Sequence, residues 1–236
     1  MQKYLIFYSH FDIIRVYIVT EIQKRRRVNV GKLFDLDNPV FRTIGKLVDL
    51  IWLNIIFIIF SLPVVTIGAS VTAMMSVTMK MARDREGYIW QGFWKSFKQN
   101  FKQSTIIWII MILVATVLGT DIYFFYTSKA GYAKILLALM LGISIICLCT
   151  AAYVFPLQAQ FDNTIKQTLK NALLMAIRHL PWTILLMVVL GVCAVLIWLF
   201  LAVAIFFGFG LTAFLCSYIF NHIFIRYIPE EIRNDY

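Results

Sequence analysis

Charged residues are scarce in this chain. Asp, Glu, Lys and Arg make up 14% of its 236 residues, whereas they make up roughly a quarter of a typical soluble domain. Hydrophobic residues make up 61%, and several apolar runs are longer than a helix in a soluble core needs. This composition excludes an ordinary soluble domain and predicts an all-α, polytopic membrane protein.

Histidine and cysteine are also rare. The three histidines, His10, His179 and His222, provide no pair at metal-ligand spacing on one helix. No CxxC pair is present, so the cysteines are expected to be small hydrophobic residues rather than a disulfide or a metal site. All four fall within apolar runs: Cys147, Cys149, Cys193 and Cys216. The P-loop, HExxH and GxSxG motifs are absent as well. We therefore expect no catalytic residues, no metal, no cofactor and no enzymatic activity.

Six apolar runs have about the 17–25 residues that a membrane-crossing helix requires. They are residues 46–62, 64–81, 104–126, 135–155, 181–202 and 205–225, and we expect them to form three hairpins. Pro63 and Gly68 are predicted to form a tight, partly buried external turn, because Pro63 lacks a helical N–H and Gly68 tolerates positive φ. The last pair is expected to turn at FFGFG, residues 206–210.

The basic residues are distributed unevenly between the segments that connect these runs. All but Lys129 and Lys134 of the 22 Lys and Arg fall on one predicted side, and positive charge stays cytoplasmic. The protein is therefore expected in a bacterial cell membrane, with both termini, the 82–103 and 156–180 loops and the 230–236 tail on the cytoplasmic side. A net charge of +10 is then explained without a nucleic acid partner. Residues 30–229 are expected to form a single six-helix membrane domain.

Residues 1–29 do not fit this pattern. His10, Asp12 and Arg15 interrupt their apolar run, which makes a membrane span unfavourable. The tandem arginines at 25–27 could be encoded by AGG-AGG, a bacterial ribosome-binding sequence, a few codons before Val30. Our hypothesis is that translation starts at Val30 and that residues 1–29 are an upstream extension. The alternative is an interfacial helix with a basic tail attracted to anionic lipid.

Two segments repeat one another without a gap at an offset of 68 residues. Residues 96–107 read SFKQNFKQSTII and residues 164–175 read TIKQTLKNALLM, which favours internal duplication over convergence. Each is predicted to be a basic amphipathic helix, the two lying side by side at the cytoplasmic surface. Lipid attraction explains the lysines, whereas neutral amides favour a protein contact. The candidate docking or lipid-facing residues are Lys98, Gln99, Lys102, Gln103, Lys166, Gln167, Lys170 and Asn171.

Polar residues inside the predicted spans are few. Asp49, Asn54 and Asp121 are candidates, since an acid in lipid can mark a proton or cation site. The simpler interpretation, which we favour for the acids, is that Asp49 pairs with Lys46 and that Asp121 is close enough to the outer surface to be hydrated. A run of small residues predicts that the second span packs closely against its neighbours: Gly68, Ala69, Ser70, Ala73 and Ser76.

From Gly31 onward the chain resembles the YesL-like family of bacterial membrane proteins of unknown function. The resemblance rests on GKLFDLDNPVFR, IIFSLPVVTIGAS, RDREGY, FWKSFKQNFKQ, TDIYFF, FDNTIKQTLKNALLMAIRHLP and NHIFIRYIP. It implies a Gram-positive origin and a role near carbohydrate uptake, because genes of this family often neighbour ABC-type sugar importers. It implies no catalytic residues, and the carotenoid-oxygenase label of some relatives would need an iron-binding histidine cluster that is absent here.

These observations predict a non-enzymatic accessory protein of a carbohydrate ABC importer. Its expected partners are the lipid bilayer and either the importer's permease subunits or a second copy of the chain. The alternative is a sugar or small-solute transporter in its own right. Convergent hydrogen-bonding groups in the spans would favour the transporter.

Overall fold

The computed structural model describes residues 39–85, 87–200, 204–228 and 230. The predictions for residues 1–29, including the start at Val30, and for most of the 230–236 tail lie outside these residues. The chain divides into two compact units, residues 1–48 and residues 49–236. The contacts reported below all belong to the second unit.

The described elements are all helical. They are Pro39–Ser61 (α2), Val64–Thr66 (η1), Ile67–Met81 (α3), Ile89–Thr127 (α4), Ala133–Gln160 (α5), Ile165–Arg178 (α6), Leu180–Leu199 (α7), the π-helical turn Ala204–Gly208 (η2), Phe209–Phe224 (α9) and Ile225–Tyr227 (η3). Within the described residues, six helical segments are long and apolar enough to cross a membrane: Thr43–Ser61, Val64–Met81, Ile89–Thr127, Ala133–Gln160, Leu180–Leu199 and Phe206–Tyr227. The prediction of an all-α chain with six apolar spans is therefore confirmed.

The helix is broken at Pro63, as predicted. α2 ends at Ser61, and α3 begins only at Ile67 after the short 3-10 turn η1. The Thr66 hydroxyl stabilises the break by lying 2.6 Å from the Phe60 carbonyl oxygen and 2.7 Å from that of Pro63. The turn is partly buried within the protein, because Ser61 and Thr66 are half-buried whereas the apolar residues Leu62, Val64 and Val65 are exposed.

Two glycines predicted to form turns lie in helices instead. Gly68 belongs to α3 and Gly210 to α9, and no described glycine has positive φ. A Cβ on Gly68 would lie 2.6 Å from the Ser104 carbonyl oxygen, and one on Gly210 would lie 2.9 Å from that of Leu50. Both predictions were wrong because these glycines serve close helix–helix approach rather than backbone freedom.

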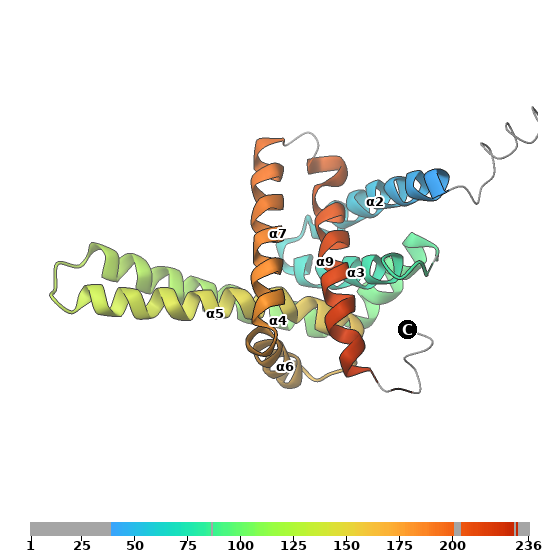
Figure 1. Cartoon of the computed structure of the whole chain (residues 1–236). Coiled ribbons are helices and arrows are strands. Elements are labelled where there is room, and N and C mark those ends of the chain that lie inside the picture. Colours follow the sequence, from blue (N-terminus) through green and yellow to red (C-terminus); the bar gives the residue numbers. More distant parts are fainter. Residues whose placement is uncertain (1–38, 86, 201–203, 229, 231–236) are drawn as a thin grey trace, which may run out of the picture. The chain divides into compact units, whose positions relative to one another are not determined.

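The first copy of the repeat is continuous with the following span. It lies in α4, whose 39 residues extend about 58 Å at 1.5 Å per residue. This exceeds the roughly 30 Å of a bilayer's hydrocarbon core, so part of α4 must lie outside it. α4 and α5 lie side by side as a long hairpin (Figure 1). Its distal part exposes apolar residues such as Leu113, Ile145 and Leu148.

The second copy forms a separate helix, α6. Thr164 and Gln167 begin it with a reciprocal capping box, in which each side chain hydrogen-bonds the other residue's backbone N–H. It ends at His179, whose φ of −111° and ψ of 43° are not helical, and Pro181 lies in the first turn of α7. Proline suits that position because the first N–H groups of a helix have no intrahelical partner. The two copies thus share a sequence but differ in how they join the next helix.

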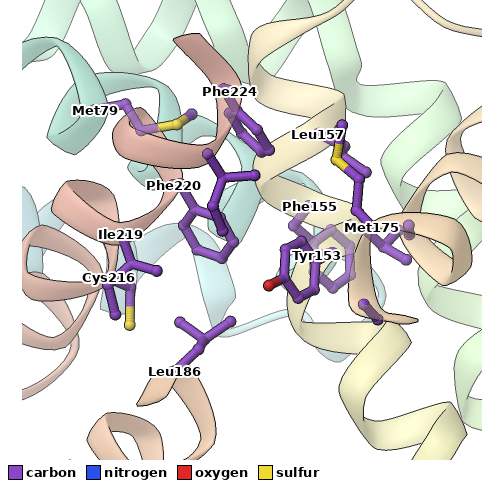
Figure 2. Close-up of a cluster of buried hydrophobic side chains, with 14 of the residues drawn as sticks. Met79, Tyr153, Phe155, Leu157, Met175, Leu186, Cys216, Ile219, Phe220 and Phe224 are labelled. Carbon is purple, nitrogen blue, oxygen red and sulfur yellow. The ribbon is translucent and has the colours of Figure 1, made fainter. Parts of the chain in front are cut away.

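α3 is the central helix of the packed unit. It packs against α4, α5 and α9, and the small residues Gly68, Ala69, Ser70, Ala73 and Ser76 are all buried. The prediction that this span is a packing helix is confirmed. A core of large side chains lies among α3, α5, α6, α7 and α9, where the Tyr153 and Phe220 rings meet edge to face at 5.5 Å (Figure 2). This core therefore joins α3, α5, α6, α7 and α9.

Candidate functional site

Gln158, near the end of α5, lies between the two copies of the repeat. Its side chain is only 4% exposed. Nε2 donates to Oδ1 of Asn100 at 3.3 Å and to Oε1 of Gln103, while Oε1 accepts from the Thr168 hydroxyl at 3.0 Å. One buried amide therefore joins α4, α5 and α6.

The partners of Gln158 occupy matching places in the repeat. Asn100 and Thr168 are equivalent at the offset of 68 residues, so Gln158 binds both copies at the same register position. Burial repeats as well, since Ser104 and Ala172 are both buried, as are Ile107 and Met175. The two copies therefore use the same face for internal packing. α6 packs against α5 and α7, and Gln158 on α5 connects the two copies by hydrogen-bonding both of them.

The four predicted lysines of the repeat are exposed: Lys98, Lys102, Lys166 and Lys170. Lys98 is partly held, because its Nζ lies 4.5 Å from the centre of the Trp94 ring, a distance at which a cation is attracted to the ring face. Trp94 in turn stacks on Phe97 at 5.9 Å between ring centres. Each copy therefore presents its two lysines outside the packed helices, where an anionic surface or partner can reach them.

The predicted amides do not behave as one group. Gln103 hydrogen-bonds Gln158, and Gln167 forms the capping box with Thr164. Gln99 is exposed and Asn171 half-buried. The internal bonds of Gln103 and Gln167 give two of the four amides a structural role, so only Gln99 and Asn171 remain as amide candidates for a contact outside the chain.

The structure places the intramembrane polar candidates in different environments. Asn54 is fully buried, and its Oδ1 accepts a 2.8 Å hydrogen bond from the Gly210 N–H in the first turn of α9. This bond links a side chain of α2 directly to the backbone of α9. Asp49 is exposed and Asp121 half-buried. Asn54 therefore joins α2 to α9, and the three residues form no common site.

Several buried hydroxyls that the sequence analysis missed also join helices in pairs. Thr72 and Ser104 lie 2.9 Å apart between α3 and α4, Thr78 and Ser217 lie 2.8 Å apart between α3 and α9, and the Tyr153 hydroxyl lies 2.9 Å from that of Thr183 between α5 and α7. The hydroxyl residues within or beside the small-residue run of the second span could have predicted the contacts of Thr72 and Thr78. Such residues favour close approach and hydrogen bonding between helices in a membrane.

A second polar cluster, which we call the basic junction, consists of Arg178, His179, Arg226 and Tyr227. His179 Nε2 lies 2.8 Å from the Tyr227 hydroxyl, and the Arg178 guanidinium carbon lies 5.9 Å from the centre of the Tyr227 ring. Burial, followed by the positive charges of Arg226 and Arg178, lowers the pKa of His179 below its ordinary value of 6.5. The sequence analysis considered His179 only as a metal ligand and therefore missed this cluster.

The six apolar helical segments and the hydrogen-bonded pairs between helices define a multi-pass helical membrane protein. A family model described as "Protein of unknown function, DUF624" matches residues 50–122, from α2 through most of α4. Two Bacillus subtilis (strain 168) proteins are similar: the uncharacterized protein YteU, 24% identical over 137 residues, and the uncharacterized protein YesL, 26% identical over 141 residues. These findings confirm the resemblance to the YesL-like family.

The matches cover part of each protein. Each spans 58% of this chain, together with 60% of YteU and 66% of YesL, so the chain spans less than two thirds of the length of these relatives. No solved structure matches the chain. The DUF624 match contains Asn54 but not its partner Gly210. It also contains two contacts between α3 and α4, the close approach of Gly68 to Ser104 and the hydrogen bond between Thr72 and Ser104.

Proposed function

We propose that this protein is a non-enzymatic accessory subunit of a carbohydrate ABC importer in a bacterial membrane. The link to carbohydrate uptake comes from the resemblance to the YesL-like family. The observation that favours an accessory role over transport is the use of the buried polar side chains. Asn54, Gln158 and the hydroxyl pairs between α3, α4 and α9 bind other helices, whereas a sugar path needs such groups directed toward the solute.

The surface proposed to contact the importer lies on the two copies of the repeat, residues 96–107 and 164–175, which we call the Lys-Gln segments. It comprises Lys98, Gln99 and Lys102 from α4 and Lys166, Lys170 and Asn171 from α6. Gln158 holds these two segments at equivalent positions, which supports one shared surface rather than two independent ones. Lysines together with the amides of exposed Gln99 and half-buried Asn171 suit a protein partner that offers acidic side chains and backbone carbonyls.

Site-directed photo-crosslinking in native membranes tests this proposal. A photoreactive residue replaces Lys98, Lys102, Lys166 or Lys170 in separate variants. Lys129 and Lys134 are matched controls, because both are exposed lysines beside the turn between α4 and α5. We expect adducts with permease subunits from the first four positions only. Equal crosslinking at both sets, or adducts with lipid alone, contradicts the docking surface.

A transport assay separates the accessory role from the alternative. Purified full-length protein in proteoliposomes is expected to show no sugar accumulation or counterflow above that of protein-free vesicles. Uptake by the chain alone would instead identify a transporter. Sugar-dependent growth of a deletion strain completes the test, since an accessory subunit should alter uptake only while the importer is present.

A further inference from the structure

The basic junction lies where two candidate spans end on the same side. The span in α7 begins at Leu180 and the span containing α9 ends at Tyr227. The 2.8 Å contact between His179 and Tyr227 holds these two ends together. A second contact reinforces the first, because the Trp182 and His222 rings lie 4.6 Å apart. Aromatic residues at the ends of membrane spans are typical of the headgroup level.

Positive charge converges on this place from two distant parts of the sequence. Arg178 comes from the last turn of α6 and Arg226 from η3, and both arginines are exposed. The charges that act most on His179 are these two cations. An anion bound between these groups would make charge-assisted hydrogen bonds with both guanidiniums.

We propose that Arg178, His179 and Arg226 form a binding site for a phosphate-bearing anion, which the position at two span ends identifies as the headgroup of an anionic phospholipid. The arginine guanidiniums supply forked donors that match phosphate oxygens. Tyr227 positions the imidazole and one guanidinium from the opposite helix end. This site is separate from the exposed lysines of the Lys-Gln segments and does not depend on the importer proposal.

Lipid binding to the purified full-length protein tests the site. Native mass spectrometry in a neutral detergent measures binding of dioleoyl phosphatidylglycerol, with dioleoyl phosphatidylcholine as the reference lipid. We expect R178Q/R226Q to weaken phosphatidylglycerol binding by about thirtyfold, the factor expected for two basic residues at a lipid surface. The matched variant K129Q/K134Q removes the same charge from two exposed lysines beside the turn between α4 and α5 and should weaken it by less than about threefold. Equal losses in both variants, or no loss in either, overturn the proposal.

Two further arms distinguish folding effects and the source of the anion. R178K/R226K keeps the charge and the fold but removes the forked donors, so a severalfold loss is expected and unchanged affinity contradicts a built site. Inorganic phosphate added in the millimolar range should leave lipid binding intact. If phosphate displaces the lipid from the wild type, the site takes the free anion and the assignment to a headgroup is wrong.

Discussion

Gly68 allows the closest approach of the backbones of α3 and α4. Its missing side chain leaves room for the Ser104 carbonyl oxygen, the Trp108 Cβ and the Phe155 ring, all within 3.2 Å of where a Cβ would lie. One turn further along, Thr72 and Ser104 hydrogen-bond each other. In lipid, where apolar burial does not drive helices together, such small-residue contacts and hydroxyl pairs carry the association.

Gly68→Ala is expected to destabilise the protein by about 1–3 kcal/mol, because the new methyl group meets backbone atoms that cannot move separately. Gly92→Ala is the matched control. A Cβ there meets only the Val77 Cγ2 at 3.5 Å, an ordinary contact, so it should be neutral or stabilise by up to about 1 kcal/mol. Thermal unfolding in detergent measures both. Equal stability of the two variants would show that Gly68 is not a packing position.

His179 predicts a pH dependence of stability. Its pKa is lowered in the folded protein below 6.5 by burial, Arg226 and Arg178, so the unfolded chain binds its proton first as the pH falls. The contribution of His179 is therefore complete above about 6.5 and is lost as the pH falls toward the lower folded value. The unfolding temperature of the wild type should fall more steeply from pH 7.5 to 5 than that of His179→Gln. Parallel curves would rule out this titration.

At the level of elements, α6 illustrates how one sequence pattern can form two structures. The first copy of the repeat continues into a span, whereas the second ends after 14 residues because Pro181 cannot continue the hydrogen bonding of a helix. The isolated α6 therefore needs its own start signal, which Thr164 and Gln167 provide. Gln99 is the residue of the first copy that is equivalent to Gln167. It lies in the middle of the continuous helix α4, where there is no helix start to cap.

This difference predicts unequal effects at two matching glutamines. Gln167→Ala removes the acceptor of the Thr164 N–H and should destabilise the first turn of α6 by about 1 kcal/mol. Gln99→Ala replaces an exposed residue in mid-helix and should change stability by less than about 0.5 kcal/mol. Hydrogen exchange followed by mass spectrometry should show faster exchange at residues 165–168 in the first variant only. Unchanged exchange there would mean that packing against α5 suffices to start the helix.

At the scale of the whole molecule, the six spans must have one orientation relative to the two sides of the membrane. The basic residues predict that both termini and the Lys-Gln segments face the cytoplasm. Lys98 lies in α4, which continues to Thr127, about 44 Å further along the axis. This length exceeds the hydrocarbon core, so the two ends of α4 can lie on opposite sides of the membrane.

Cysteine labelling in intact cells tests this orientation. The four native cysteines, all in apolar spans, are first replaced by alanine. A cysteine at position 129 should react with a membrane-impermeant maleimide from outside, whereas cysteines at 98 and 166 should react only after permeabilisation. The reverse pattern would invert the topology and move the proposed importer contact to the outer surface.

The sequence by itself determined the helical class, the approximate positions of the six spans, the break at Pro63 and the close packing of α3. Those features follow from local composition: long apolar runs, a missing N–H, and consecutive small side chains. Tertiary structure alone decided what Gly68, Gly210, Gln103 and Gln158 do. Their roles depend on atoms 10 to 160 positions away in the chain, such as the Thr168 hydroxyl and the Ser104 and Leu50 carbonyl oxygens, and no local pattern records which distant atom will approach a given residue.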